Sequence, residues 1–195
     1  MGESVFAARA ALDKEFNLCP WRYSAEPFRI LGNLYYVGNL RVCMHLIDTG
    51  DGLILIDTGH PHTAFMLFHS IWQLGFRPSD VKYIIFSHGH FDHVTAMEEL
   101  RRDRGVPVYA CEQEQAVLAD PDKNLSVQFQ GGGLHLKADM LLKDGETFEA
   151  AGYTFQMLHT PGHTEGSCCY YVKSEKVLFS GDTLFEGSYG RIDFP

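Results

Sequence analysis

The 195-residue sequence has no long apolar run, no excess of positive charge and no closely spaced cysteine pair of the zinc-binding type. A membrane-spanning helix needs about 20 consecutive apolar residues, so we expect no membrane association. The chain has 16 lysine and arginine residues against 25 aspartate and glutamate residues, which gives a net charge of -9. Nucleic acids and anionic membranes bind positively charged surfaces, so we expect neither as a partner, and a nuclease is disfavoured.

The cysteines do not suggest a disulfide framework. There are five of them, and Cys168 and Cys169 are sequence neighbours, which rarely bridge each other. Residues 1–17 carry charges at spacings that interrupt the apolar core of a signal peptide. We therefore expect free thiols in a reducing compartment and a cytoplasmic protein.

The length fits one domain of the α/β class. Residues 3–16 predict a helix, so we expect residues 1–27 to form an N-terminal helical arm in front of a domain at 28–195. Alternation of strands and helices within that domain indicates layered α/β construction. The expected helices are 63–74 and 92–104, and the expected strands are 28–31, 34–37, 43–48, 53–57, 81–86, 106–110, 139–143, 147–150, 153–158, 167–172 and 176–179.

Two segments of the chain show a weak internal likeness. Residues 46–59 (LIDTGDGLILIDTG) and 170–183 (YYVKSEKVLFSGDT) both read as strand, turn, strand and a polar end rich in glycine, aspartate and threonine. Helices and further strands follow the first segment, whereas only a short stretch follows the second. We therefore expect the second half of the fold to be incomplete and to lack its helices.

Histidine is concentrated in one place, the sequence Ser-His-Gly-His-Phe-Asp-His at 87–93. The pattern HxHxDH is expected by chance roughly once in six hundred sequences of this composition, so a functional cluster is favoured. The backbone is still extended where it leaves the apolar strand, so His88 and His90 project to one side and can hold one ion. Asp92 and His93 can face a second ion. Imidazole and carboxylate ligands suit Zn²⁺, and Fe or Mn less selectively.

Two later loops offer matching ligands. Thr160-Pro161-Gly162 breaks a strand and presents His163, and Ser180-Gly181 precedes Asp182. Taken alone, both are common loop strings and carry little information.

Together these residues resemble the metallo-β-lactamase superfamily of metallohydrolases, in the family's order, from about residue 28 to residue 195. The resemblance implies a four-layer αββα sandwich with metals at one edge, bordered by the loop at 57–59. It also implies the ligands: His88, His90 and His163 on the first metal, Asp92 and His93 on the second, and Asp182 bridging.

The two ends of the domain resemble different branches of the superfamily. Residues 181–195 (GDTLFEGSYGRIDFP) resemble glyoxalase-II-type thioesterases, and residues 27–39 (PFRILGNLYYVGN) resemble the histidine-rich metallo-β-lactamases. The final histidine that these branches supply to the second metal has no counterpart after His163. The helical domain that holds glutathione in glyoxalase II is also absent, and Phe185 stands where the lactonase branch has tyrosine. We therefore expect the second metal position to be weaker, half-filled, or completed by water or by a neighbouring chain.

These features predict a zinc hydrolase in which a metal-bound hydroxide attacks a small acyl substrate, either a thioester of the hydroxyacylglutathione kind or a lactam or lactone. Asp92 is the candidate catalytic residue, orienting the hydroxide and taking its proton. Phe185 and Tyr189 are candidates for an apolar substrate wall, and Arg191 for holding an acidic group. Two alternatives remain: a mononuclear iron sulfur dioxygenase and a non-catalytic metal-binding remnant. The sequence leaves the oligomeric state open.

Overall fold

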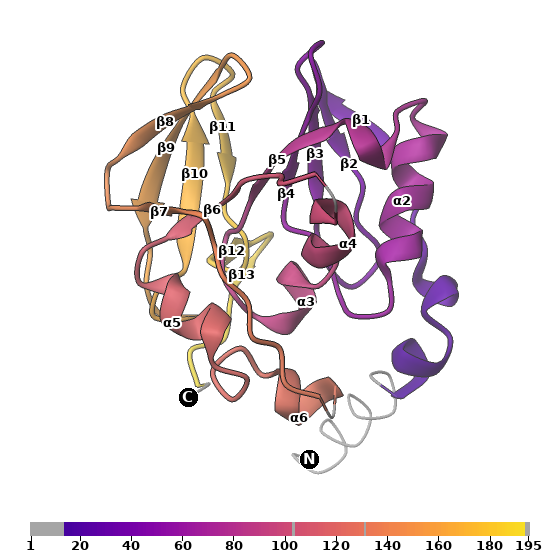
Figure 1. The fold of residues 1–195 in the computed structure, drawn as a ribbon, viewed down its shortest axis with the longest axis vertical. Helices are drawn as coiled ribbons and strands as arrows, with labels where there is room; N and C mark the ends of the chain where they lie inside the picture. Colours follow the sequence, from indigo (N-terminus) through magenta and orange to yellow (C-terminus); the bar gives the residue numbers. More distant parts are fainter. Residues whose placement is uncertain (1–13, 103, 131, 194–195) are drawn as a thin grey trace.

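The computed structural model describes residues 14–102, 104–130 and 132–193, which build two facing β-sheets with helices on one side (Figure 1). The first sheet has seven strands. Its order follows the chain: β1 (Phe28–Leu31), β2 (Leu34–Tyr36), β3 (His45–Asp48), β4 (Leu53–Ile56), β5 (Val81–Ile85), β6 (Val108–Cys111) and β7 (Met140–Leu142). Strands β1 to β4 pair antiparallel, and β4 to β7 pair parallel. Parallel neighbours need crossover connections, and these carry most of the helices.

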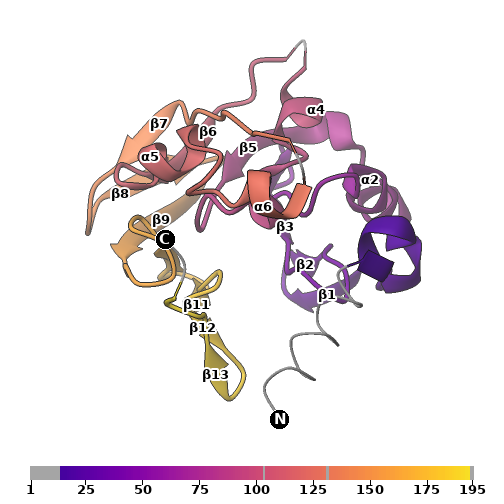
Figure 2. The ribbon, with the colours of Figure 1, turned by 90° about the horizontal axis from the view of Figure 1, so that it is seen from below.

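The second sheet has four antiparallel strands in the order β11-β10-β9-β8. They are β8 (Thr147–Ala150), β9 (Tyr153–His159), β10 (Cys168–Val172) and β11 (Val177–Phe179). A separate two-stranded hairpin of β12 (Leu184–Phe185) and β13 (Ser188–Tyr189) follows, and it projects outward from the two sheets (Figure 2).

The helices are short except for α2. The α-helices are α2 (Ala64–Gln73), α3 (Phe91–Val94), α4 (Met97–Arg101), α5 (Glu114–Ala119) and α6 (Ser126–Gln130), and the 3₁₀ helices are η1 (Pro20–Tyr23) and η2 (Pro78–Asp80). Residues 14–18 are also helical. Within the described ranges, no helix combines the length and apolar character that crossing a membrane requires.

Alternating side chains of the first sheet divide the apolar core in two. Leu46, Leu55 and Ile84 are fully buried against α2 and α4. Ile54 and Ile85, equally buried, face the second sheet. Each such side chain contributes about 1.5–3 kcal/mol on burial, so the central strands hold both the helical layer and the second sheet in place.

The α/β class and the two-sheet sandwich are confirmed. Helices α2 and α4 lie on the face of the seven-stranded sheet turned away from β8–β11 (Figures 1 and 2). In the part of the chain that the structure describes, no helix covers the outer face of the four-stranded sheet, so three of the four expected layers are present. Among the described residues after α6, every helix or strand assigned is a strand.

The predicted helix at 92–104 is wrong as a single element, because α3 and α4 are separate. The carbonyl of His93 accepts hydrogen bonds from the backbone and the hydroxyl of Thr58, at 2.6 and 3.2 Å, instead of continuing the helix. The amide of Thr95 likewise donates to the Gly59 carbonyl. Contacts with the 57–59 loop therefore end the first helix after one turn.

Most of the predicted N-terminal helix, residues 3–13, lies outside the described residues. Its described end packs on the domain: Phe16 is 2% exposed, and its ring lies edge-on against those of His60 and Tyr23. The boundary between residues 27 and 28 stays a prediction.

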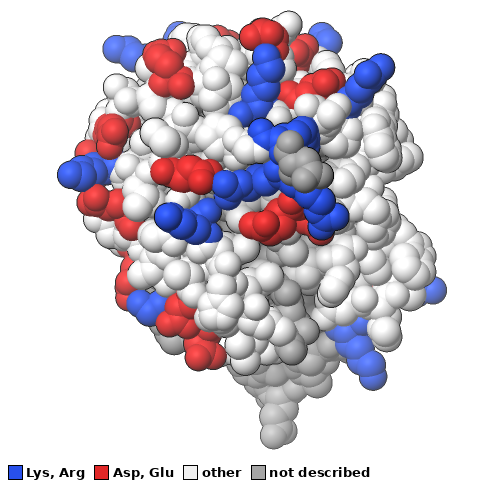
Figure 3. Space-filling model, viewed as in Figure 1, with Lys and Arg blue, Asp and Glu red and all other residues white. Residues whose placement is uncertain are grey.

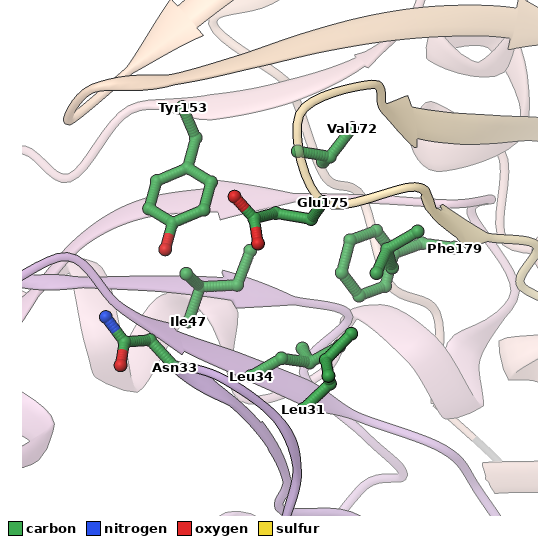
Figure 4. Close-up of a pocket in the computed structure, with 9 residues that line it drawn as sticks. Leu31, Asn33, Leu34, Ile47, Tyr153, Val172, Glu175 and Phe179 are labelled. Atoms are coloured by element: carbon green, nitrogen blue, oxygen red, sulfur yellow. The ribbon is translucent and has the colours of Figure 1, made fainter.

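A small pocket opens between the two sheets at their hairpin end (Figure 4). Ile47, Tyr153, Glu175 and Phe179 are among the residues that line it. About 20 Å³ is accessible to the centres of water-sized molecules, which is room for about one water. This pocket is therefore too small for a substrate, and it contains no residue of the histidine cluster.

Candidate metal centre

Three loops converge at the edge of the sandwich where β5 ends. The first follows β5 and carries His88 and His90, the second joins β9 to β10 and carries His163, and the third follows β11 and carries Asp182. One ligand atom each from His88, His90 and His163 lies within 4.8 Å of the others. Nδ1 of His90 and Nε2 of His163 are only 2.9 Å apart. Residues more than 70 positions apart in sequence therefore form one nitrogen group.

A second group of ligand atoms adjoins the first. It consists of His88, His93 and Asp182, again within 4.8 Å of one another. Asp182 Oδ1 lies 3.4 Å from Nε2 of His93, and Oδ2 lies 3.5 Å from Nε2 of His163. The Asp182 carboxylate thus belongs to the second group and also approaches His163 of the first, in agreement with the bridging ligand that the family resemblance implies. The structure puts His88 in both groups, whereas the resemblance implies the first metal alone.

Hydrogen bonds on the far side of the rings fix which nitrogens face the cluster. Nδ1 of His163 lies 2.7 Å from the backbone carbonyl of Arg191, so it donates there and turns Nε2 inward. Nδ1 of His93 lies 2.9 Å from Oδ2 of Asp57, which turns its Nε2 toward Asp182. Such partners fix the tautomer and orientation of histidines that ligate metals.

The orientation of His88 depends on Ser87 and Asp57. The Asp57 carboxylate accepts the Ser87 backbone amide at 2.8 Å and its hydroxyl at 2.6 Å. The hydroxyl oxygen is then free to accept from Nδ1 of His88 at 3.1 Å. Nε2 of His88 is buried and has no hydrogen-bond partner among the described residues. An unsatisfied buried polar atom costs about 1–3 kcal/mol, and a cation held by this nitrogen removes that cost, so the donor set fits a metal ion.

Burial and crowding keep two of the rings neutral. Burial, followed by the charge of His163, lowers the pKa of His90 to about 3. Burial and the three neighbouring rings lower the pKa of His88 well below its usual value. Neutral imidazole is the form that binds metals, so both rings are ready to coordinate an ion at neutral pH.

His93 behaves in the opposite way. Burial lowers its pKa, but the carboxylates of Asp182 and Asp57 outweigh that effect and raise it to about 10. Burial also raises the pKa of Asp182. In the absence of a cation, the proton on His93 therefore supplies positive charge between two carboxylates.

The backbone of the supporting loops is tightly constrained. Asp57 has a φ of 59°, an uncommon conformation for a residue other than glycine. Gly181 has a φ of 49°, and a Cβ there would lie 2.4 Å from both Cβ and Oγ of Ser87. Only glycine lets the chain before Asp182 approach Ser87 so closely.

Asp92 lies beside the cluster but belongs to neither ligand group. It is half-buried in α3, and its charge raises the pKa of His90 and of His93. Its roles as a ligand to the second metal and as the catalytic residue stay predictions.

The predicted substrate residues lie on and just after the β12–β13 hairpin. Phe185 is 46% exposed and Tyr189 is 69% exposed. The guanidinium of Arg191 is paired in a bidentate way with Asp193, at 2.7 Å for each contact, while its carbonyl holds His163. The side chain of Arg191 is therefore already engaged with an acid of this chain, and its predicted contact with substrate remains untested.

The remaining described histidines belong to neither ligand group. His159 and His135, for example, contact the carbonyls of Glu165 and Ala119. The sequence alone predicted no metal ligand among these histidines, and it did not predict that Ser87 orients His88 or that the buried carboxylate of Glu114 accepts the Gly89 amide between His88 and His90. The position of Ser87 directly before the first ligand could have indicated its role. No sequence pattern around Glu114 indicates a role for that residue.

Comparisons with known proteins agree with this geometry. Residues 38–195 match the family model described as the metallo-beta-lactamase superfamily. The "Probable metallo-hydrolase YqgX" of Bacillus subtilis is 39% identical over 80% of this chain and 72% of its own length. The hydroxyacylglutathione hydrolase GloC of Haemophilus influenzae is 36% identical over 78% of this chain and 71% of its own. The class B3 di-zinc metallo-beta-lactamase LRA-12, from an Alaskan soil metagenome, superposes with a TM-score of 0.68 at 36% identity. That match covers 82% of this chain but only 62% of the solved chain, less than two thirds.

Proposed function

Because this chain belongs to the metallo-β-lactamase superfamily, we propose that it is a zinc-dependent hydrolase that cleaves a small acyl substrate, with a thioester favoured over a lactam or lactone. The observation that carries the proposal is the convergence of His88, His90 and His163, together with the buried Nε2 of His88, which has no hydrogen-bond partner among the described residues. A scaffold without a ligand would leave that nitrogen unsatisfied at a cost in stability.

His88, His90 and His163 would hold the first zinc ion, and His93 and Asp182 would contribute to a second. A bound zinc ion would supply Lewis acidity and lower the pKa of a coordinated water to about 7. Iron or manganese can occupy the same kinds of ligand less selectively.

The chain's own residues supply orientation and proton transfer. Asp57 holds Ser87 and His93, and the Arg191 carbonyl holds His163, so the ligand nitrogens keep their directions when substrate enters. Asp92 is our candidate for the proton carrier, because it lies beside both ligand groups without belonging to either. It would accept a proton from the attacking water and return it to the leaving group.

The surroundings of the site favour a small substrate with an apolar part. Phe185 and Tyr189 present exposed rings on the hairpin that follows Asp182. On the face shown in Figure 3, basic and acidic side chains are interspersed. One pair of opposite charges, Arg101 and Asp139, is 2.9 Å apart. This mixed charge gives no support to a nucleic-acid partner. A thioester is favoured because the hydroxyacylglutathione hydrolase of Haemophilus influenzae matches along 71% of its length.

Hydrolysis assays on the zinc-loaded protein test the proposal. The substrates are S-lactoylglutathione, a chromogenic cephalosporin and an acyl lactone. We expect thioester turnover by the wild type, loss of at least 100-fold in His163→Ala, and unchanged turnover in the matched control His135→Ala, whose ring lies outside both ligand groups. Equal turnover by His163→Ala would contradict the proposal. Iron uptake together with sulfur-dependent oxygen consumption would replace it with the dioxygenase alternative.

A further inference from the structure

A buried carboxylate outside the ligand groups joins two of the loops that form them. Glu114, the first residue of α5, is 1% exposed. Its Oε1 accepts the backbone amide of Gly89 at 2.6 Å. Its Oε2 accepts the hydroxyl of Thr164 at 2.8 Å, and the backbone amide of Gly166 also donates to the carboxylate. One side chain therefore holds three donors from two loops.

These donors are immediate neighbours of the candidate ligands. Gly89 lies between His88 and His90, and Thr164 follows His163. Fixing the Gly89 amide and the Thr164 hydroxyl on one carboxylate fixes the distance between the two loops. The hydrogen bonds of Glu114 thus help to keep His90 Nδ1 and His163 Nε2 at their separation of 2.9 Å, although Glu114 bonds to the loop backbone and to Thr164 and not to the two rings.

Glycines at two positions leave room for the Glu114 carboxylate between the two loops. A Cβ on Gly166 would lie 2.2 Å from the backbone nitrogen of Glu114 and 2.5 Å from its Oε2. A Cβ on Gly89 would lie 3.0 Å from Oε1. Two glycines therefore permit the close approach of both loops to Glu114.

Burying this acid has a cost that its partners offset. Burial raises the pKa of Glu114, while the bonds from Thr164, Gly89 and Gly166 lower it. A buried carboxylate without partners is strongly unfavourable, whereas hydrogen bonds to a charged group are stronger than those between neutral groups and offset that cost. The carboxylate is thus satisfied only while both loops are in place.

We propose that Glu114 is a positioning residue that sets the separation of His163 from His88 and His90 and thereby the zinc affinity of this group. The inference rests on the proposed binding of zinc there. Without the carboxylate the loops move apart, and three nitrogens no longer meet around one ion. Substitutions behind metal ligands typically reduce metal affinity about 10–100-fold, and we expect Glu114→Gln to fall in that range.

Glu114→Gln keeps the shape of the side chain but turns an amide NH₂ group toward hydrogen-bond donors. Three measurements apply: zinc affinity by competition with a chromophoric chelator, the visible spectrum of the cobalt-substituted protein, and thermal unfolding of the metal-free protein. We expect weaker zinc binding and an altered cobalt spectrum. The matched control is Asp139→Asn, because Asp139 also accepts a backbone amide, that of Val108 at 2.9 Å, and its other side-chain partner, Arg101, likewise lies outside these loops. It should leave zinc affinity and spectrum unchanged.

Wild-type zinc affinity and a wild-type cobalt spectrum in Glu114→Gln would overturn the proposal, even if the variant unfolds at a lower temperature. Should Glu114→Gln not fold, Thr164→Val removes one donor without a change of shape. A smaller loss of affinity in that variant supports the proposal, and an unchanged affinity overturns it. These readouts need no substrate, so absent hydrolysis by a wild type that binds zinc tightly would contradict the proposed function and leave this inference standing.

Discussion

Nδ1 of His93 lies 2.9 Å from Oδ2 of Asp57, and both side chains are only 4% exposed. The same carboxylate holds Ser87 through two bonds. Asp57 therefore controls the direction of His93 and, through Ser87, that of His88.

Replacing Asp57 by asparagine should weaken both ligand groups. The amide keeps one oxygen for the Ser87 backbone but presents NH₂ where His93 and the Ser87 hydroxyl need an acceptor. We expect zinc affinity to fall about 10–100-fold and stability to fall by about 3–5 kcal/mol. Chelator competition and urea unfolding measure the two effects. Unchanged zinc affinity would show that the ring orientations do not depend on Asp57.

The metal-free protein should lose stability as the solution becomes alkaline. The pKa of His93 is raised from 6.5 to about 10 in the folded state, so the folded protein binds the extra proton between these values. Its contribution is fully present below pH 6.5 and is lost as pH rises through about 10. Urea unfolding of metal-free protein between pH 6.5 and 10 measures the slope. We expect a shallower slope in His93→Gln, and an identical slope would rule out His93 as its source.

Zinc should bind in two unequal steps. Nδ1 of His88 is engaged with Ser87, so only Nε2 is available, although His88 belongs to both groups. One nitrogen cannot complete both sites, and the three-histidine group should take it. Calorimetric titration of metal-free protein is expected to give one tight step and a second at least about tenfold weaker. Two steps of equal affinity would contradict this.

Gly181→Ala should damage the cluster, whereas Gly187→Ala should not. Both glycines have positive φ, 49° and 72°, so both substitutions carry backbone strain of about 1–2 kcal/mol. Only at Gly181 does a new Cβ meet another residue, Ser87 at 2.4 Å, while the space around Gly187 is open. Metal content after dialysis against zinc should drop in the first variant alone. Equal metal content in the two variants would mean that Ser87 can move without cost.

Shortening Phe185 to alanine should act on substrate binding. The ring is 46% exposed, so its removal leaves no internal cavity and little change in stability is expected. If the ring packs on the acyl group, KM rises several-fold while kcat and zinc affinity stay near wild type. The same kinetics for variant and wild type would exclude Phe185 from the substrate wall.

The sequence predicted what depends on local pattern. Strands β1 and β8 begin and end at the predicted residues, and the spacing of His88, His90 and His93 marked the cluster. The break between α3 and α4 was not predictable, because it depends on Thr58 bonding to the His93 carbonyl across 35 positions. The role of Glu114 was hidden for the same reason: acids at the start of a helix usually face solvent, and only the folded chain brings Gly89 and Thr164 to this one.

The candidate ligands are divided between the sheets: His88, His90 and His93 follow β5 of one, while His163 and Asp182 extend from strands of the other. An ion bound by both sets of ligands would link the two sheets directly. Loss of the ion would lower the activation barrier for unfolding by separation of the two sheets. The lifetime of the folded protein should therefore depend on the concentration of free zinc. By the same reasoning, a substitution in the core between the sheets, at Phe155 for example, should be detected first as faster loss of metal.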